Sequence, residues 1–407
     1  MLISLMTTLL QFAAICLALA TMAFVAQAAA AIFLSDRPFR TSSSRPRITV
    51  LVPAHNEEQM IEATLLRIKE DLWPSDRLLV IADNCIDQTA QLAARTGADI
   101  VVRDDSGRRG KGFALAAGLR HLAATPPEVV IFIDADCQVG PHSVELLARA
   151  CAAADGPVQC LNLIIADPAS SASPPRLAEF AWRIKNDFRP TGYARLGLPC
   201  QLLGTGMAVP WTLIQPERFA TGHLSEDMLF GLELAMEGHP PRFFRVARVT
   251  SYFPDSQHGR EQQRQRWVHG HLGLIYSHVP RLIYNSLRRR DIGLLALAFD
   301  LAVPPLGVLA VADLILAMSC LIFAAVTGAS APLGLAMLGC TLFSFCLATA
   351  WCVCGRDLVG AKEIKQLPRH LMLVMRSALN LVLGHKAQWI RADRLRTSIH
   401  VGRPPHR

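Results

Sequence analysis

The stretch Val129-Val130-Ile131-Phe132-Ile133-Asp134-Ala135-Asp136 decides the fold. Its unbroken apolar run lies between Pro126-Pro127 and Gly140-Pro141 and predicts a strand buried on both faces, as in a parallel sheet. Side chains two residues apart on a strand share a face, so Asp134 and Asp136 are expected to converge at the carboxyl edge of the sheet. Open α/β sheets bind ligands there, and two carboxylates suit Mg²⁺ or Mn²⁺ completed by substrate phosphates. An acidic strand end that simply turns into a loop is the alternative.

The residues before this stretch alternate between strand and helix patterns. Strands are expected over 48–53, 78–82 and 99–102, and helices after Asn56, over 87–96 and over 113–123. Asn56 is a good residue to cap the first of these helices. This alternation predicts an α/β fold with a mostly parallel sheet. Polar residues such as Asp83 follow the strands, as in a nucleotide-binding cleft.

A basic, glycine-rich loop at 106–112 contains Lys111. Its glycines do not have the spacing of the phosphate-binding loop of NTPases, and Lys111 is not followed by the Ser or Thr that this loop requires. No dinucleotide fingerprint follows the first strand. The sequence therefore argues against an NTPase and against an NAD enzyme. Lys111 either neutralises substrate charge or lies in a solvated loop.

The second half of this region carries three polar motifs. A strand over 202–209 is interrupted by glycines, which often marks close approach of a ligand. Ser225 is expected to cap a helix that opens with Glu226-Asp227, acids that the helix dipole also favours at this position. In Gln263-x-x-Arg266-Trp267 the three residues share one helix face. There an arginine suits a phosphate and an indole suits a sugar ring, although an interfacial tryptophan beside snorkelling arginines is the alternative.

The composition indicates a membrane protein, since 51% of the 407 residues are hydrophobic and 18% are charged. Apolar stretches over 2–34, 301–326 and 332–353 exceed the roughly 20 residues that cross a bilayer. Basic clusters around 37–47, 288–290 and 356–365 all fall on one side if there are three spans. The positive-inside rule then predicts a multi-pass protein of the inner or plasma membrane, with its amino terminus outside and its hydrophilic region in the cytoplasm. The first stretch is long and lacks a basic start, which argues against a cleaved signal peptide.

The expected organisation follows from these patterns. The net charge of +8 is mostly explained by the basic clusters beside the membrane, and no aromatic-interleaved basic stripe indicates nucleic-acid binding. Eleven cysteines without zinc-type spacing indicate reduced cytosolic thiols. The predicted segments are a transmembrane helix over 1–35, a catalytic domain over 46–270, an interfacial helix region over 271–300, transmembrane helices over 301–327 and 332–354, and a cytoplasmic tail with an interfacial helix over 355–407.

Asp83, Asp134-Ala135-Asp136, Glu226-Asp227 and Gln263-x-x-Arg266-Trp267 occur in this order in one chain. The ordered set resembles family 2 of the glycosyltransferases, specifically the membrane-embedded branch that includes cellulose, chitin, hyaluronan and poly-N-acetylglucosamine synthases. The resemblance covers about residues 46–270 and implies a GT-A fold and an inverting transfer from a nucleotide-diphospho sugar.

The resemblance also implies roles for individual residues. Asp227 would be the general base and Asp136, with Asp134, would hold Mg²⁺ or Mn²⁺. Donor binding would involve Glu57, Asp83, Lys111 and Asp134, of which Lys111 is our own addition from the sequence. Acceptor binding and gating would involve Gly204, Thr205, Gly206, Gln263, Arg266 and Trp267.

The partners expected are a nucleotide-sugar donor, a glycan or lipid-linked acceptor, membrane lipids and export proteins. Exopolysaccharide synthesis is the first interpretation. Three spans are few for a complete translocation channel, so transfer of one sugar to a polyprenyl-phosphate carrier or a sphingolipid stays open. A membrane scaffold with a non-catalytic sugar-binding fold is the third interpretation.

Overall fold

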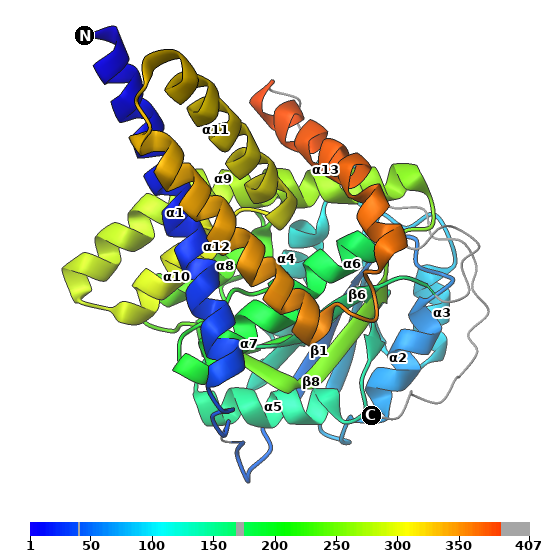
Figure 1. Ribbon diagram of the computed structural model, residues 1–407. Coiled ribbons are helices and arrows are strands. Elements are labelled where there is room, and N and C mark those ends of the chain that lie inside the picture. Colours follow the sequence, from blue (N-terminus) through cyan, green and yellow to red (C-terminus); the bar gives the residue numbers. More distant parts are fainter. Residues whose placement is uncertain (40, 168–174, 384–407) are drawn as a thin grey trace.

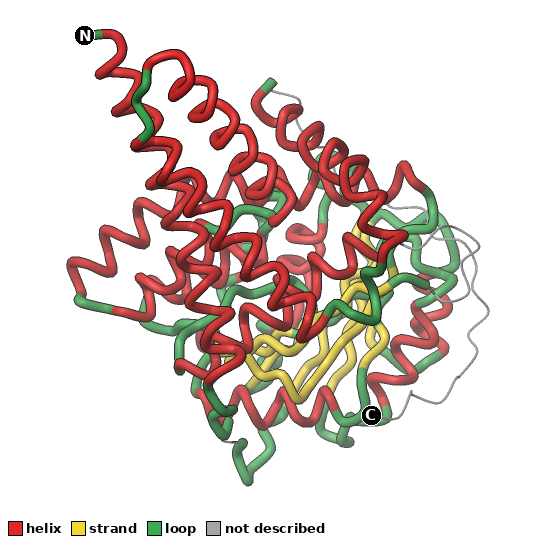
Figure 2. The backbone as a smooth tube through the Cα atoms, in the orientation of Figure 1, coloured by secondary structure: helices red, strands yellow, loops and turns green. Residues whose placement is uncertain are grey.

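An eight-stranded sheet forms the centre of the computed structural model, which describes residues 1–39, 41–167 and 175–383. Long helices project from one side of the sheet, and the described chain begins at the far end of one of them (Figure 1). The tube view shows the strands gathered in one layer below these helices (Figure 2). The strand order is β3-β2-β1-β4-β7-β6-β8-β5. The strands are β1 (Ile48–Ala54), β2 (Arg77–Asp83), β3 (Asp99–Arg103), β4 (Val129–Phe132), β5 (Gln138–Val139), β6 (Val158–Ile165), β7 (Met207–Pro210) and β8 (Arg242–Tyr252).

The predicted mostly parallel α/β sheet is confirmed. Strand β1 lies parallel to β2 and β4, β2 parallel to β3, and β6 parallel to β8. Strand β7 runs antiparallel to both β4 and β6, and the short β5 runs antiparallel to β8. The parallel half therefore points the ends of β1, β2 and β4 toward the same edge, where the cavity described below lies.

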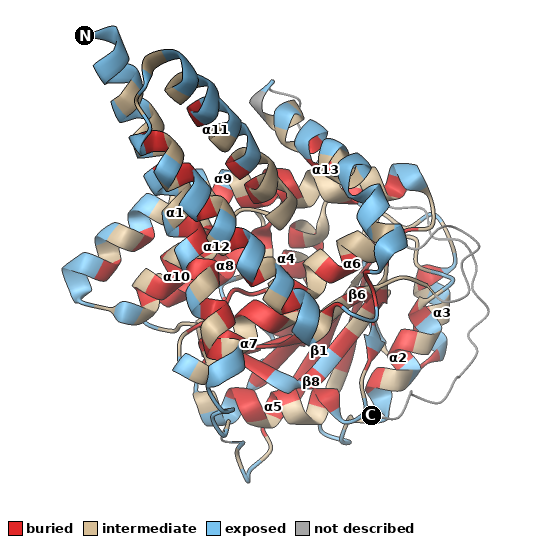
Figure 3. Ribbon diagram, in the orientation of Figure 1, coloured by how far each residue is buried: buried red, intermediate tan, exposed pale blue. Residues whose placement is uncertain are grey.

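Helices cover both faces of the central strands, which explains their continuous apolar sequences. On one face, Val50 and Ile131 pack with residues of α2 (Ile61–Lys69) and α5 (Ser143–Ala154). On the other, Leu51 and Phe132 pack with α4 (Lys111–Leu122) and α8 (Glu226–Met236). Burial is concentrated in the sheet and in the helix faces against it (Figure 3). Helix α3 (Thr89–Arg95) packs against α2 near the outer strands.

The strand that decides the fold ends earlier than expected. Strand β4 stops at Phe132, and Asp134 and Asp136 lie in the loop and turn that follow it. The expectation that they share a face of a strand is therefore wrong. The loop is held in place differently, because the Asp134 amide donates a hydrogen bond to Thr205 Oγ1 at 3.0 Å.

Two other local expectations are wrong. Helix α2 begins at Ile61, and Asn56 adopts a positive φ of 57° in the preceding turn, where its Oδ1 accepts a hydrogen bond from the Ile86 amide. Of the expected strand over 202–209, only the end from Met207 onward belongs to β7. Gly204 and Gly206 precede it with positive φ. Both errors arise where the chain turns at the cavity edge, because the turns are fixed by distant contacts.

The remaining helices follow the sheet or surround it. They are α1 (Leu2–Phe33), α6 (Arg176–Arg183), α7 (Arg189–Leu196), α9 (Gln257–Arg289), α10 (Ile292–Ala302), α11 (Leu306–Thr327), α12 (Ala331–Cys354) and α13 (Ala361–Val382), with short turns at Trp211–Leu213 and Pro216–Arg218. A π-helical turn, Ile184–Phe188, joins α6 to α7. The expected interfacial region over 271–300 comprises the second half of α9 and most of α10, and the expected tail beyond residue 383 lies outside the described residues.

Three helices of the described chain are long and apolar enough to cross a membrane, namely α1, α11 and α12. Helix α1 packs against α12 and against α7, so it joins the other long helices to the sheet domain. Gly192 of α7 makes this approach possible, since a Cβ there would lie 2.0 Å from the Gln27 carbonyl oxygen. Pro304 and Pro305 separate α10 from α11, so the span expected over 301–327 begins at Leu306.

A buried polar network ties α1, α7 and α10 together. Arg189 Nη2 lies 2.8 Å from Asp300 Oδ1, and Arg189 Nε donates to Gln27 Oε1 at 2.7 Å. Asp300 also accepts hydrogen bonds from Gln27 and Gln201. A charge pair this well buried stabilises little by itself, but removing one partner leaves the other unpaired.

We therefore expect Arg189→Met to lower the free energy of unfolding by about 3–5 kcal/mol. Thermal or denaturant unfolding of the purified protein measures this loss. Arg245→Met is the matched control, because Arg245 pairs with Asp187 at a more exposed position and should cost about 0–1 kcal/mol. Equal losses for the two variants would contradict a structural role for the buried network.

Candidate active site

A cavity of about 290 Å³ lies at the edge where β1, β2 and β4 end. It brings together residues that are up to 214 positions apart in the chain, from Pro53 to Trp267. Ten of the twelve predicted site residues line it, which argues against their being unrelated surface groups. These ten are Glu57, Asp83, Lys111, Asp134, Asp136, Gly204, Asp227, Gln263, Arg266 and Trp267.

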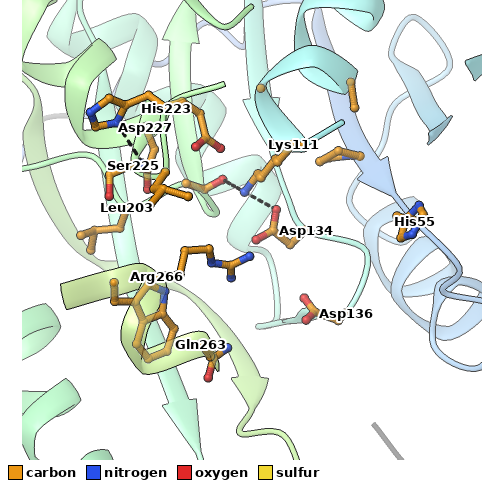
Figure 4. Close-up of a pocket in the computed structure, with 18 of the residues that line it drawn as sticks. His55, Lys111, Asp134, Asp136, Leu203, His223, Ser225, Asp227, Gln263 and Arg266 are labelled. Carbon is orange, nitrogen blue, oxygen red and sulfur yellow. Dashed lines mark hydrogen bonds and ion pairs between the residues drawn. The ribbon is translucent and has the colours of Figure 1, made fainter. Parts of the chain in front are cut away.

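Lys111 is the positive centre of the cavity. Its Nζ forms an ion pair with Asp134 Oδ1 and donates a hydrogen bond to the Gly204 carbonyl at 2.7 Å (Figure 4). Burial alone would lower the pKa of Lys111, but the carboxylates of Asp134 and Glu226 outweigh it, and the pKa is raised. The lysine is therefore charged and held at the cavity wall, which contradicts the solvated-loop alternative.

Two acids enter the cavity from the first turn of α8. Ser225 precedes this helix as predicted, but its side chain makes no capping hydrogen bond. Burial and the neighbouring Asp227 raise the pKa of Glu226 to about 7. Burial also raises the pKa of Asp227, and Lys111 opposes this rise. Figure 4 shows Asp227 facing the same space as Lys111 and Asp134. A carboxylate with a raised pKa is a better proton acceptor than an ordinary aspartate.

Helix α9 supplies the third part of the cavity. Gln263, Arg266 and Trp267 lie on one face of this helix and all line the cavity, and Figure 4 shows the Arg266 guanidinium among the acids. The Trp267 ring packs on the ring of Trp182 from α6, with centroids 4.4 Å apart. Trp267 therefore forms part of the cavity wall and is packed against Trp182.

The outer end of the cavity carries the predicted nucleotide-binding residues. Asp83 is buried and pairs with Arg103 Nη1 at 2.5 Å. The Glu57 amide donates a hydrogen bond to Thr89 Oγ1, which fixes the loop after β1. His55 Nδ1 lies 2.7 Å from the Asp83 carbonyl oxygen, so the loops after β1 and β2 are joined.

The two remaining predicted residues do not line the cavity. Thr205 is buried and supports the Asp134 loop from behind through its hydroxyl. Gly206 lies against β6, where a Cβ would come within 2.1 Å of Cys160 Sγ. Their acceptor-binding role rests on the resemblance alone, since their observed contacts are structural.

The structure also adds residues that the sequence interpretation missed. His223, Trp182 and Lys185 line the same cavity, as does Glu226, which the sequence placed in a motif but gave no role of its own. The Lys185 ammonium lies 5.6 Å from the centre of the Trp182 ring, and Lys185 belongs to the π-helical turn. π-Helical turns are rare and often occur at functional sites, but their sequences carry no simple signal.

The comparisons with known proteins agree with this arrangement. A family model described as "Glycosyltransferase like family 2" matches residues 46–270. The chain belongs to glycosyltransferase family 2.

Several named relatives match shorter parts of the chain. An uncharacterized glycosyltransferase of Mycobacterium tuberculosis is 44% identical over 22% of this chain and 36% of its own. The probable glycosyltransferase YdaM of Bacillus subtilis is 31% identical over 22% of this chain and 23% of its own. Glucosyl-3-phosphoglycerate synthase of M. tuberculosis is 38% identical over 23% of this chain and 30% of its own. These matches span less than half the length of each relative.

One solved structure resembles almost the whole chain. It is a mannosyltransferase from Pyrobaculum calidifontis in complex with GDP-Man and Mn²⁺, with a TM-score of 0.56 and 20% identity. The similarity covers 93% of this chain and 100% of that one. At this identity it supports the fold of the family 2 transferase, including its helices beside the sheet domain.

Gly204 gives a direct test of the cavity geometry. Its φ is +79°, and a Cβ there would lie 2.7 Å from Asp227 Oδ2 and 3.2 Å from Lys111 Nζ. We expect Gly204→Ala to lower the transfer rate by roughly 10–100-fold, because a displacement of about 1 Å at a reacting group has effects of this size. Initial rates with a nucleotide-sugar donor measure the change.

Gly238→Ala is the matched control. Gly238 also has a positive φ, at +98°, but nothing lies within 4 Å of its Cβ position. Both variants carry backbone strain, so only the Gly204 variant should lose activity beyond its loss of stability. Equal activity of the two would mean that Asp227 and Lys111 do not have to stay where the structure places them.

Proposed function

We propose that this family 2 glycosyltransferase moves a sugar, with inversion at the anomeric carbon, from a nucleotide-diphospho sugar to an acceptor hydroxyl. The observation that carries the proposal is the position of Asp227 in the same cavity as Asp134, Asp136 and Lys111. An inverting displacement needs one carboxylate to take the acceptor proton and a second group of residues to hold the leaving diphosphate. The cavity offers both.

Two carboxylates of the cavity can hold the divalent cation expected for this chemistry. No group of three or more His, Cys, Asp and Glu suited to a metal occurs in the described part of the chain. Asp134 and Asp136 nevertheless offer hard oxygen ligands, and Mg²⁺ or Mn²⁺ is commonly held by one or two carboxylates plus substrate phosphates. Asp134 is paired with Lys111, and the resemblance implies that Asp136 binds the metal more directly. When bound, the cation would stabilise negative charge on the leaving diphosphate.

The side chains around the donor have separate roles in this proposal. Glu57 and Asp83 bind the nucleotide, with Asp83 fixed by Arg103. Lys111 and Arg266 stabilise the charge that develops on the diphosphate. Asp227 accepts the proton of the acceptor hydroxyl as that oxygen bonds to the anomeric carbon, and the nucleoside diphosphate leaves with the bonding electron pair.

Gln263 and Trp267 close the acceptor side. Gln263 is buried, and Trp267 is braced by Trp182, so the indole can present a fixed apolar face to a sugar ring. The predicted acceptor role of Gly204 fits its place between Lys111 and Asp227. This wall also keeps water from the anomeric carbon, which favours transfer over hydrolysis.

The membrane arrangement supports a biosynthetic role at the bilayer. We propose that α1, α11 and α12 span the membrane with the amino terminus outside and the transferase domain in the cytoplasm, where the basic clusters beside the spans belong. The product proposed first is an exopolysaccharide or its repeat unit, as in the membrane-embedded synthase branch. Export proteins would then act after this enzyme.

The decisive experiment uses the full chain in lipid with a panel of labelled nucleotide sugars and Mn²⁺. Transfer with inverted anomeric configuration supports the proposal, and retained configuration overturns the role of Asp227 as sole base. A ladder of products indicates a growing polysaccharide, whereas a single extractable glycolipid indicates one transfer to a lipid. Absence of both transfer and hydrolysis for every donor would favour the non-catalytic scaffold.

A further inference from the structure

A second cavity, of about 500 Å³, adjoins the donor cavity. It lies between α6, α9, the start of α11 and α13. The two cavities share four lining residues, namely Trp182, Lys185, Gln263 and Trp267. The two packed tryptophans therefore lie at the boundary between the cavities, where a molecule in the second cavity can approach the donor.

One wall of the second cavity is apolar and belongs to the helices beside the membrane. Pro304, Pro305 and Leu306 line it at the start of α11, and Leu373 and Val374 line it from α13. Helix α11 is one of the three membrane-length helices. Helices α11 and α13 pack closely here, since a Cβ on Gly307 would meet the Val374 side chain at 3.1 Å. This wall suits a hydrocarbon chain that enters from the bilayer.

A second part of the cavity lining is strongly basic. Six Lys and Arg side chains line the cavity, against one carboxylate among its described lining residues, Glu363. That carboxylate is engaged, because Glu363 accepts a hydrogen bond from the Gly360 amide at the start of α13. The six basic residues are Arg176, Lys185, Arg189, Arg260, Arg264 and Arg369.

Two of these cations are satisfied within the protein. Arg189 pairs with Asp300, and Arg260 donates to the carbonyl oxygens of Pro254 and Asp255. Arg264 is different, because its Nη1 is buried without a hydrogen-bond partner in the described part of the chain. A buried guanidinium nitrogen with no acceptor is costly, and a bound anion would remove that cost.

The charge of Glu261 acts on Arg264 from outside the cavity lining, and the two histidines that line the cavity add no charge. His271 and His370 also line the cavity, and burial lowers the pKa of His271 to about 3 and that of His370 to about 4. Both imidazoles are therefore neutral near pH 7. Lys185 stands at the junction of the two cavities, where burial lowers its pKa and the charge of Asp227 opposes this. The basic wall thus continues up to the proposed catalytic base.

We propose that the second cavity binds the acceptor, and that the acceptor is a membrane lipid carrying a phosphate between its hydrocarbon chain and its reacting hydroxyl. This inference rests on the proposed function and adds the chemical class of the acceptor. The apolar wall takes the chain, Arg264 and its basic neighbours take the phosphate, and the hydroxyl passes Trp182 and Trp267 to Asp227. The phosphate is not consumed: the hydroxyl oxygen bonds to the anomeric carbon, its proton goes to Asp227, and the nucleoside diphosphate leaves.

A neutral glycan fits these walls less well. Sugars bind mainly through stacking and neutral hydrogen bonds, and they would leave the buried Arg264 Nη1 without a charged partner. A free phosphate would satisfy the cations but not the apolar wall of α11 and α13. An anionic lipid satisfies both walls at once.

The test measures binding to the full chain in phosphatidylcholine nanodiscs, with EDTA present so that the donor site holds no metal. Geranylgeranyl diphosphate is the probe, inorganic pyrophosphate carries the charge without the chain, and geranylgeraniol carries the chain without the charge. We expect the amphiphile to bind at least about 10-fold more tightly than either fragment, since each wall supplies more than about 1.4 kcal/mol.

Arg264→Gln should raise the dissociation constant of geranylgeranyl diphosphate by about 10-fold or more, the size expected for losing a hydrogen bond to a charged group. Arg264→Lys, which keeps the charge, should recover part of the affinity. Arg288→Gln is the matched control, because Arg288 is an exposed residue of α9 outside the cavity. Thermal unfolding of each variant checks that it is folded.

Three results would overturn this inference. Pyrophosphate could bind as tightly as geranylgeranyl diphosphate, or geranylgeraniol could bind as tightly as geranylgeranyl diphosphate. The third result is that Arg264→Gln leaves the affinity for geranylgeranyl diphosphate unchanged. Binding of nucleoside diphosphate with Mn²⁺ is measured in parallel. If Arg264→Gln weakens the lipid probe alone, the acceptor assignment stands, whereas wild-type protein that binds no nucleotide would contradict the proposed function instead.

Discussion

Asp227→Asn is expected to lower the rate of sugar transfer by about 10²–10⁴-fold, the range for loss of a general base. The amide keeps the size of the carboxylate but cannot accept the hydroxyl proton. Asp227 lies in the first turn of α8, beside Gly204 and within the charge field of Lys111. Because none of the proposed nucleotide contacts involves Asp227, the dissociation constant of the donor should stay close to that of the wild type.

Two measurements separate this role from a structural one. Single-turnover transfer gives the chemical step, and calorimetry with the donor gives binding. Glu237→Gln is a suitable control, because Glu237 follows the same helix at its other end, where its pair with Arg218 is partly exposed. An Asp227→Asn protein that transfers sugar at the wild-type rate would rule out this residue as the base.

Comparison with the neighbouring Glu226 supports the assignment of Asp227 as the base. Its pKa of about 7 means that it is partly protonated at neutral pH, so it can donate as well as accept a hydrogen bond. Lys111 and Arg266 both lower the pKa of this carboxyl against the effect of burial. Asp227, which is also held toward its charged form by Lys111 and Lys185, is the better candidate for a base that must be ionised.

The sequence predicted the overall sheet because strong apolar strands alternate with amphipathic helices, and this pattern depends on local residues. It predicted Asp227, Arg266 and Trp267 through ordered motifs, and these residues do meet in one cavity. The prediction failed at turns. Asp134 and Asp136 lie beyond the end of β4, where the Asp134 amide donates a hydrogen bond to Thr205, 71 positions away, and so holds the chain.

The residues that the sequence did not reveal share a physical reason. Trp182 of α6 and Lys185 of the π-helical turn belong to no catalytic motif. Trp182 packs on Trp267 of α9, far along the chain, and Lys185 lies against Trp182. Arg264 follows Gln263 within a recognised motif, yet only the structure shows that it faces a different cavity. Long-range neighbours of this kind leave no periodic signal in a single sequence.

A second large effect on the rate of sugar transfer is expected when the divalent cation is removed. Removing divalent cations with EDTA should abolish transfer, and Mn²⁺ should restore it, because a cation on the leaving diphosphate supplies several kcal/mol of stabilisation. Asp136→Asn should lower the rate by about 10²–10³-fold at fixed Mn²⁺, the size seen when one charge-stabilising group is lost. It should also raise the Mn²⁺ concentration needed for half-maximal activity. Electron paramagnetic resonance of Mn²⁺ with nucleoside diphosphate present measures the affinity without turnover.

Comparison with Asp134 shows which carboxylate is the ligand. Asp134→Asn also breaks the ion pair with Lys111, so it should weaken donor binding even without metal. Asp136→Asn leaves that ion pair intact and should change only the part of donor binding that depends on the metal. Asp104→Asn, at an exposed position outside the cavity, serves as the control. If Asp136→Asn kept the Mn²⁺ affinity and rate of the wild type, the cation would have to bind elsewhere, and Asp136 would not be its ligand.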